Sequence, residues 1–282
     1  MTVTVPPADA VSPDALRTAF NASFADYLLK FPPFDAAAWR TFVQRQGVDL
    51  AASRAALRDA AVVAFSMITP RTQQRTRIAV MGAVPSERGS GVAASLLEEA
   101  IANAQARGDH WLELEVFRTN HRAVALYRRH GFEPVCELHG WRAAPGQGRA
   151  QVCDVNEVAR AAASRWLVTL DDALPWQASG AAVQAAPAEV QAWQLGKAQL
   201  VFTLGADNSA AVVSLADRDP SHVAATELLA AMRQRFPVHT LAAPQCQRSD
   251  GASRAFEAAG WARQPLMQWF MRRTLQDDRA AS

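Results

Sequence analysis

A glycine-containing segment, residues 84–93 (VPSERGSGVA), joins an expected strand to the start of an expected helix. The N–H groups of a first helical turn have no acceptor within the helix, and the helix dipole makes that end attractive to anions. Gly89 and Gly91 let an anion approach the main chain, and Arg88 adds a positive charge beside it. The segment therefore predicts a phosphate-binding loop, although a purely structural turn has the same composition.

Other residues have side chains suited to proton transfer. Tyr127 lies in the helical pattern of residues 121–130, and its phenol carries a proton at neutral pH; a packed tyrosine on an amphipathic helix is the alternative. Glu113 and Glu115 alternate with apolar residues in the stretch 112–116, which is typical of a strand with one apolar face. Either carboxylate can act as a base through water, or both are solvated or paired with arginine. We keep Glu115 as the candidate base.

Periodicity, caps and breakers predict the elements that position these residues. Ser12 followed by Pro13 starts the first helix, and Gly108 and Gly131 end two later ones. The predicted order is helices over 12–30 and 35–46, a hairpin of 55–57 with 62–68, a strand over 77–84, helix 91–107, strand 112–116, helix 121–130 and strand 135–141. The sequence thus predicts an α/β (α+β) domain with a strand, the glycine loop and a helix in succession.

Two motifs in this order resemble those of the GNAT superfamily of N-acetyltransferases. Residues 88–93 fit the pattern Gln/Arg-x-x-Gly-x-Gly/Ala, and residues 120–132 (NHRAVALYRRHGF) fit N-x-x-A-x-x-L-Y-x-x-x-G-F. The resemblance covers about residues 1–142, with Ala64 standing where many members have glycine. It implies the GNAT fold, a mixed central sheet whose two central parallel strands splay apart, with acetyl-CoA as cosubstrate. It also implies direct transfer of the acetyl group to a primary amine.

The same resemblance implies roles for individual residues. Tyr127 is expected to protonate the departing sulfur of CoA and Asn120 to contact the pantetheine or the product side, while Phe24, Asp26 and Tyr27 cover the acceptor pocket or simply pack there. The pantetheine is expected to meet the main chain of Met81, Gly82, Ala83 and Val84, and the diphosphate to lie on Arg88, Gly89, Ser90, Gly91, Val92 and Ala93.

The C-terminal half repeats this order of features with an offset of 129 residues, which brings Gly131 onto Gly260 and Val84 onto Val213 at the end of a predicted strand. In this overlay the loop 88–93 is replaced by residues 217–222 (DRDPSH), whose two acids and proline disfavour a diphosphate. Phe256 stands in place of Tyr127. We therefore expect two tandem copies, a GNAT domain over 1–145 and a degenerate GNAT-like domain over 150–282 without acetyl-CoA, joined by a linker at 143–150.

Composition argues against several other classes of function and site. The chain has 29 Lys plus Arg against 27 Asp plus Glu, with no basic stripe, so nucleic-acid binding is not expected. No signal peptide and no long apolar span are visible, which predicts a cytoplasmic protein without membrane attachment. Cys136, Cys153 and Cys246 lack metal-ligand spacing and are expected to be buried thiols, with no metal site.

The expected partners are acetyl-CoA and a small-molecule or peptide amine, with a homodimer left open. The alternative function is a CoA-binding regulatory or interaction protein that has lost turnover.

Overall fold

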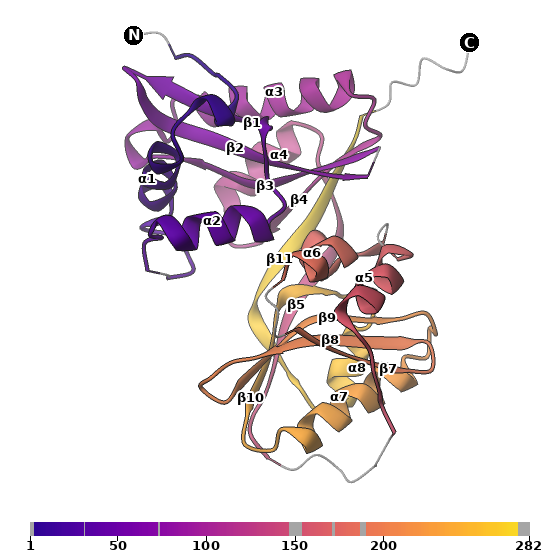
Figure 1. Cartoon of the computed structure of the whole chain (residues 1–282). Helices are drawn as coiled ribbons and strands as arrows, with labels where there is room; N and C mark the ends of the chain where they lie inside the picture. The colour runs from indigo at the N-terminus through magenta and orange to yellow at the C-terminus, as the bar shows by residue number, and fades with distance from the viewer. Residues whose placement is uncertain are drawn as a thin grey trace, which may run out of the picture. The chain divides into compact units, whose positions relative to one another are not determined.

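The structure, a computed structural model, describes residues 3–30, 32–72, 74–146, 154–170, 173–186 and 190–275. These residues form two compact units (Figure 1) that are not consecutive stretches of the chain. The first unit consists of the described residues of Met1–Leu114, His121–Glu133 and Met271–Ser282, and the second of Glu115–Asn120 and Pro134–Phe270. Strands β4 (Trp111–Phe117) and β11 (Ala262–Thr274) therefore each contribute residues to both units. The predicted boundary at residues 145–150 stays a prediction.

The first unit is built around β1 (Asp49–Arg58), β2 (Ala61–Thr72), β3 (Arg75–Ala83) and β4, in that order, with the end of β11 beside β4. The pairs β1/β2 and β2/β3 are antiparallel, and β3/β4 is parallel. The helices are α1 (Pro13–Phe24), α2 (Ala36–Arg45), α3 (Val92–Ala106) and α4 (His121–Arg129), with short 3-10 turns at Ala8–Ala10 and Pro85–Glu87.

Alternating side chains of β1 and β2 pack on opposite faces of this sheet. Ala55 and Phe65 pack with α1 and α2, whereas their neighbours Ala56 and Ala64 pack with α3. Figure 1 shows α1 and α2 in front of the strands. On that face Phe20 is the centre of an aromatic cluster, since its ring lies 4.7–6.1 Å from five others: Phe24, Phe34, Trp39, Phe42 and Phe65.

The second unit has the strand order β11, β5 (Glu133–Ala143), β10 (Thr240–Arg248), β9 (Ser209–Asp217), β8 (Ala198–Leu204), β7 (Val190–Leu195) and β6 (Asn156–Glu157). The pair β10/β9 is parallel, and the pairs β10/β5, β9/β8, β8/β7 and β7/β6 are antiparallel. Its helices are α5 (Arg160–Val168), α6 (Gly180–Ala185), α7 (Val223–Arg235) and α8 (Ser253–Ala258), with a 3-10 turn at Trp176–Ala178. Trp141 and Phe256 stack in its core, 5.4 Å apart.

Most predicted elements of the first unit are confirmed, and the differences have local causes. Ser12 caps α1 by accepting from the Ala15 amide (3.2 Å), but the helix ends at Phe24 rather than near residue 30. Strands β10 and β11 were not predicted. Pro244 interrupts β10, and residues 262–274 mix Pro265 and arginines with apolar residues and do not alternate cleanly. The ungapped overlay is wrong at the loop, since Val213 lies inside β9, which continues to Asp217. Residues 147–153, with Cys153 and most of the predicted linker, lie outside the described residues.

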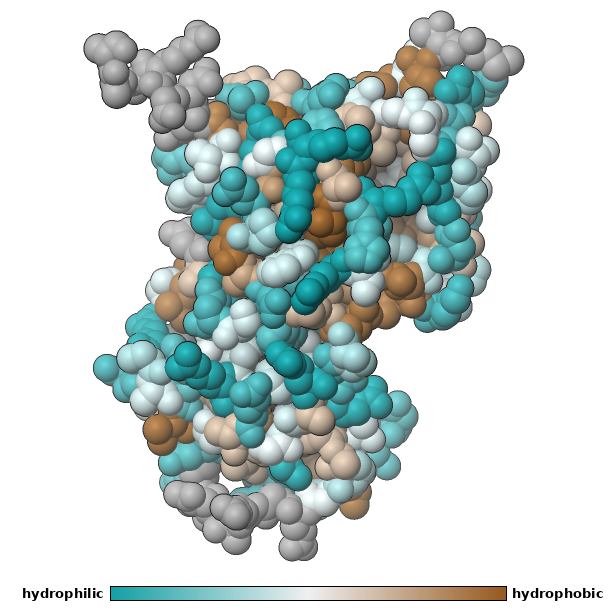
Figure 2. All heavy atoms as spheres, turned by 180° about the vertical axis from the view of Figure 1, so that it is seen from behind, coloured by the Kyte–Doolittle hydropathy of each residue, from teal (hydrophilic) through white to brown (hydrophobic). Residues whose placement is uncertain are grey.

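The surface carries no large apolar patch in the view from behind, where hydrophilic residues are interspersed with apolar ones (Figure 2). Among the described residues, the exposed large apolar side chains come from separate elements, apart from the consecutive pair Leu28 and Leu29. No described helix is long and apolar enough to cross a membrane.

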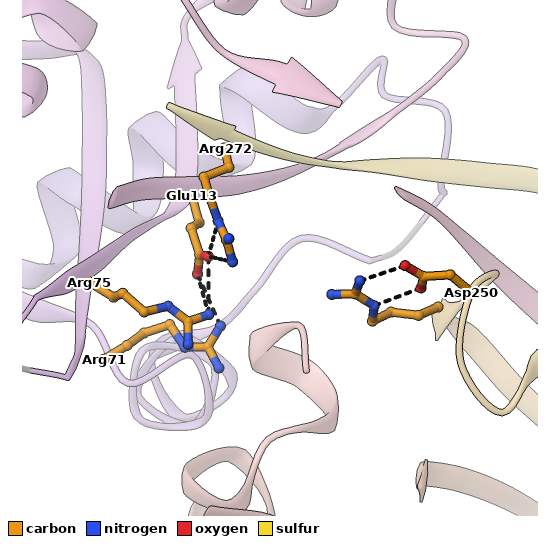
Figure 3. A network of polar contacts seen from close by, with 6 residues as sticks. Arg71, Arg75, Glu113, Asp250 and Arg272 are labelled. Carbon is orange, nitrogen blue, oxygen red and sulfur yellow. Dashed lines mark hydrogen bonds and ion pairs between the residues drawn. The ribbon is translucent and has the colours of Figure 1, made fainter. Parts of the chain in front are cut away.

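Glu113 of β4 is fully buried and holds three guanidinium groups in the first unit (Figure 3). Its carboxylate accepts from Arg75 (2.9 and 3.0 Å), Arg71 (3.1 Å) and Arg272 (2.7 and 2.9 Å). Arg272 comes from the end of β11, where its guanidinium also lies 4.8 Å from the centre of the Trp111 ring. This one carboxylate thus ties the C-terminal strand to β4 and to the β2–β3 hairpin.

Glu113→Gln should lower the free energy of unfolding by about 3–5 kcal/mol, because removing one partner of a buried ion pair leaves the other charges uncompensated. Denaturant unfolding at neutral pH measures this loss. The control is Glu98→Gln, since the Glu98 side chain is 66% exposed and pairs with His130 at 3.3 Å. If both variants lose equally little stability, Glu113 does not hold the unit together.

Candidate active site

The segment after β3 forms an open loop at the N-terminus of α3. A 3-10 turn at Pro85–Glu87 follows the strand, and Gly91 is the N-cap of α3. Gly89 and Gly91 have φ values of +87° and +92°, a left-handed conformation that side-chain-bearing residues rarely adopt. A Cβ added at either glycine would meet nothing within 4 Å, so the space above the loop is open.

The amide groups of this loop point into that space without acceptors. The first hydrogen bond of α3 runs from the Ser95 amide to the Gly91 carbonyl (3.1 Å), and the Val92 amide makes only a 3.4 Å contact with Ser90 Oγ. Within the described part of the chain, four amides of the loop and first turn have no acceptor: those of Gly89, Gly91, Ala93 and Ala94. This concentration of amide donors at a helix N-terminus suits an anion.

Two ion pairs fix the loop from either side. Glu87 accepts two hydrogen bonds from Arg58 of β1, at 2.9 and 3.1 Å. Arg88 donates to both carboxylate oxygens of Asp26 (2.5 and 2.7 Å), a residue just beyond the end of α1. It also donates to the Ser23 carbonyl (3.0 Å) in the last turn of α1. The hydrogen bond from Arg88 lowers the pKa of Asp26 to about 2, and the same contact raises the pKa of Arg88. The residue predicted to meet the diphosphate is thus paired with a carboxylate in this structure.

The edge of β3 that faces away from β2 is open beyond Ile78. The parallel pairing of β3 with β4 runs only from Arg75↔Trp111 to Ile78↔Leu114, although β3 continues to Ala83. Because the Val84 amide donates to Val63 of β2, alternation along the strand turns the main-chain groups of Met81 and Ala83 to the open edge. Of the four residues predicted to meet the pantetheine, these two have the suitable direction.

Gly82 has a different part in this region. A Cβ at this position would lie 2.9 Å from Phe65 Cζ, 3.2 Å from Ser23 Cβ and 3.3 Å from Phe24 Cε2. Only glycine lets the end of α1 come this close to β3. Its neighbours in sequence, Met81 and Ala83, pack on the other face, with α3.

Tyr127 is buried in the first unit. It lies on α4, is 8% exposed, and its ring centre is 5.8 Å from that of Phe132. Burial raises the pKa of Tyr127 well above the ordinary value, and the neighbouring Tyr27 raises it further. The phenol therefore keeps its proton at neutral pH, which suits a proton donor and not a base.

The two remaining predicted residues belong to the second unit. Glu115 is half-buried in β4 and contributes, after burial, to raising the pKa of Cys246 to about 12. The Asn120 amide donates to the Phe117 carbonyl at 2.9 Å. The loop and Tyr127 are thus brought into one unit, and the roles of Glu115 and Asn120 stay predictions. Glu113 is paired with arginines, which was one of the two interpretations of this residue from the sequence.

The segment between β9 and α7 in the second unit, residues 217–222, has its amides occupied. Asp217 accepts from the Ala225 amide near the start of α7 (3.2 Å) and from the Asp219 amide (2.8 Å). Asp219 in turn accepts from the Ser221 amide at 3.0 Å, which is the main cause of its lowered pKa. The protein's own carboxylates thus lie where an anion would bind.

Sequence reasoning missed the partner of Arg88. It gave Asp26 only as a residue that covers the acceptor pocket or packs there. The two residues are far apart in the chain, and no local pattern links them. Cys136 and Cys246 are buried thiols as predicted, and no group of three or more metal-ligating side chains occurs among the described residues.

Comparisons with known proteins agree with this geometry. Residues 15–132 match the acetyltransferase (GNAT) family. No curated protein matches the chain. Three GCN5-related N-acetyltransferases are similar in structure. That of Sphaerobacter thermophilus is 15% identical, with a TM-score of 0.63 over 98% of this chain and 96% of that chain. That of Anabaena variabilis is 12% identical, with a TM-score of 0.68 over 98% of this chain and 73% of that chain, and that of Kribbella flavida is 15% identical, with a TM-score of 0.60 over 97% of this chain and 71% of that chain.

At these identities the structural likeness shows the fold alone, and it extends over both units. Residues 15–132 are a GNAT acetyltransferase domain.

A Tyr27→Phe variant leaves Tyr127 as the only tyrosine, because the chain has two. Its tyrosinate absorbance should appear well above pH 10 in the folded protein and near pH 10 in denaturant, since burial disfavours the charged form. The raised pKa means that the folded state holds this proton more tightly, so the stability it contributes is present below about pH 10 and is lost as pH rises further. Titration of the folded phenol near pH 10 would show that Tyr127 is not buried.

Proposed function

We propose that the chain transfers the acetyl group of acetyl-CoA to a primary amine of a small molecule or peptide by direct transfer. The observation that supports this most is the set of acceptor-free amides at the N-terminus of α3. Acetyl-CoA supplies the activated acetyl thioester. The residues of the chain bind and orient it and move protons.

The diphosphate of CoA fits the loop at Gly89–Ala93. Several convergent N–H donors, one arginine and the positive end of a helix are the arrangement that such an anion requires. The open edge at Met81 and Ala83 would then hydrogen-bond the amides of the pantetheine, as a strand would. Asn120 is proposed to contact the pantetheine or the product side.

The reaction needs a neutral amine and a proton for the departing thiolate. An amine with a pKa of about 10.4 is neutral only about once in 10³ at pH 7, equivalent to roughly 4–5 kcal/mol of barrier. Tyr127 is proposed as the acid, because its phenol stays protonated in its buried position. Glu115 is proposed as the base through water. Glu113 is a poor candidate, since its carboxylate is buried among three guanidinium groups.

The C-terminal part of the chain, residues 150–282, is proposed to be a degenerate GNAT-like domain that does not take acetyl-CoA. Asp217 and Asp219 occupy the amides at the start of α7, and Phe256 is buried against Trp141 without a hydroxyl. The alternative of a wholly inactive CoA-binding protein has less support, because the first unit keeps both the open loop and a protonated phenol.

A broad amine panel with acetyl-CoA, read by release of thiol, tests the proposal. The Tyr127→Phe variant should lose about 10²–10⁴-fold in kcat, the usual contribution of a general acid, with CoA affinity unchanged because the loop is untouched. Calorimetric titration of CoA gives the affinity. Equal loss of kcat and affinity would make Tyr127 a structural residue, and absence of CoA binding to the parent protein would contradict the proposed function itself.

A further inference from the structure

The contact between Asp26 and Arg88 places an internal anion at the diphosphate loop. Arg88 is the only cationic residue of the segment 84–93. Its Nη1 and Nη2 atoms each donate to one oxygen of Asp26, so the carboxylate takes the face that a guanidinium offers to a phosphate. Asp26 is ionised at any working pH, because its pKa lies near 2.

A bound diphosphate and this carboxylate would compete. Both are anions that a guanidinium binds in the same bidentate manner, and like charges at such a short distance repel. The amides of the loop can reach a diphosphate, whereas the Asp26 carboxylate accepts from the Arg88 side chain. The ion pair is also weakly held, since the Asp26 side chain is 61% exposed and that of Arg88 31%, and exposed pairs contribute little to stability.

The carboxylate lies on the turn that follows α1, where the rings of Phe24 and Tyr27 also meet edge to face with their centres 5.0 Å apart. Helix α1 ends at Phe24, and the Tyr27 amide donates to the Phe24 carbonyl at 3.1 Å. Leu28 and Leu29 beyond it are 49% and 41% exposed. The helix itself is held firmly, by the cluster around Phe20 and by the paired hydrogen bonds of Asn21 with the main chain of Phe34, both 2.9 Å.

The same turn is near the proposed acid, since Tyr27 lies close enough to Tyr127 to influence it electrostatically. At its other end Ser23 packs closely on β3 at Gly82 and accepts from Arg88. One short stretch of chain, residues 23–27, therefore contacts the diphosphate loop, the open strand and the surroundings of Tyr127.

We propose that Asp26 occupies Arg88 in the absence of CoA, and that the diphosphate displaces it and releases the turn at residues 25–30. This inference rests on the proposed function. Cofactor binding then loosens the chain that follows α1, and Asp26 sets the affinity for CoA.

Calorimetric titration of CoA, with hydrogen exchange of residues 25–30, tests the proposal on the full chain. Asp26→Asn should bind CoA about 3–10-fold more tightly, because an internal competitor with weak, exposed contacts is removed. In the parent protein the Tyr27 amide should exchange faster once CoA is added. In Asp26→Asn it should exchange fast from the start and not respond to CoA.

Arg88→Ala separates this account from a general loosening of the loop. It should release the turn just as Asp26→Asn does, yet weaken CoA binding. The control is Asp14→Asn, which removes an exposed pair of the same kind with Arg17 (3.2 Å) on the same helix and should change neither readout.

Weaker CoA binding by Asp26→Asn, or slower exchange of the turn on CoA addition to the parent, would overturn the proposal while leaving the proposed function intact. A parent protein that binds no CoA would overturn both.

Discussion

The constraint on which the site depends is that the amides of Gly91, Ala93 and Ala94, at the start of α3, have no acceptor among the described residues. A helix start normally has a side-chain cap, and here Gly91 provides none. The left-handed glycines at 89 and 91 set the direction of the chain and leave the space above it open. The pair of Arg58 with Glu87 holds the loop in this form, so that its donors are oriented before an anion arrives. The same start in the second unit is capped by Asp217, and that difference separates two helices of similar position in the sequence.

Arginine–carboxylate contacts serve two purposes in the first unit. The buried contacts of Glu113 are permanent, because separating charges in the interior costs far more than separating them at the surface. They let the end of β11 complete the unit that contains the loop. The pair of Arg88 and Asp26 is exposed, so its partners can be exchanged at low cost. The buried contacts of Glu113 therefore support the fold, whereas the exposed pair of Arg88 and Asp26 can respond to a ligand.

Local patterns predicted much of the first unit, and contacts distant in sequence account for what they missed. The cap at Ser12, the loop glycines and the helix of Tyr127 are readable because each depends on residues within a few positions. The contact of Asp26, just beyond α1, with Arg88 joins residues more than sixty positions apart, so no local pattern predicts it. Strand β11 has an irregular sequence and gains its place from partners such as Glu113. The open edge at Met81 was predicted only through the family resemblance, because the sequence of one strand does not show which strand it pairs with.

The most direct test of the account compares two glycines at opposite ends of α3. Gly91 and Gly108 both have positive φ values, and a Cβ at either meets nothing within 4 Å. Gly91→Val and Gly108→Val should therefore lose comparable stability, roughly 1–3 kcal/mol from the strained backbone. Calorimetric titration of CoA should show at least a tenfold weaker affinity for Gly91→Val and the parental affinity for Gly108→Val. Equal affinities in the two variants would contradict the claim that the start of α3 binds the diphosphate.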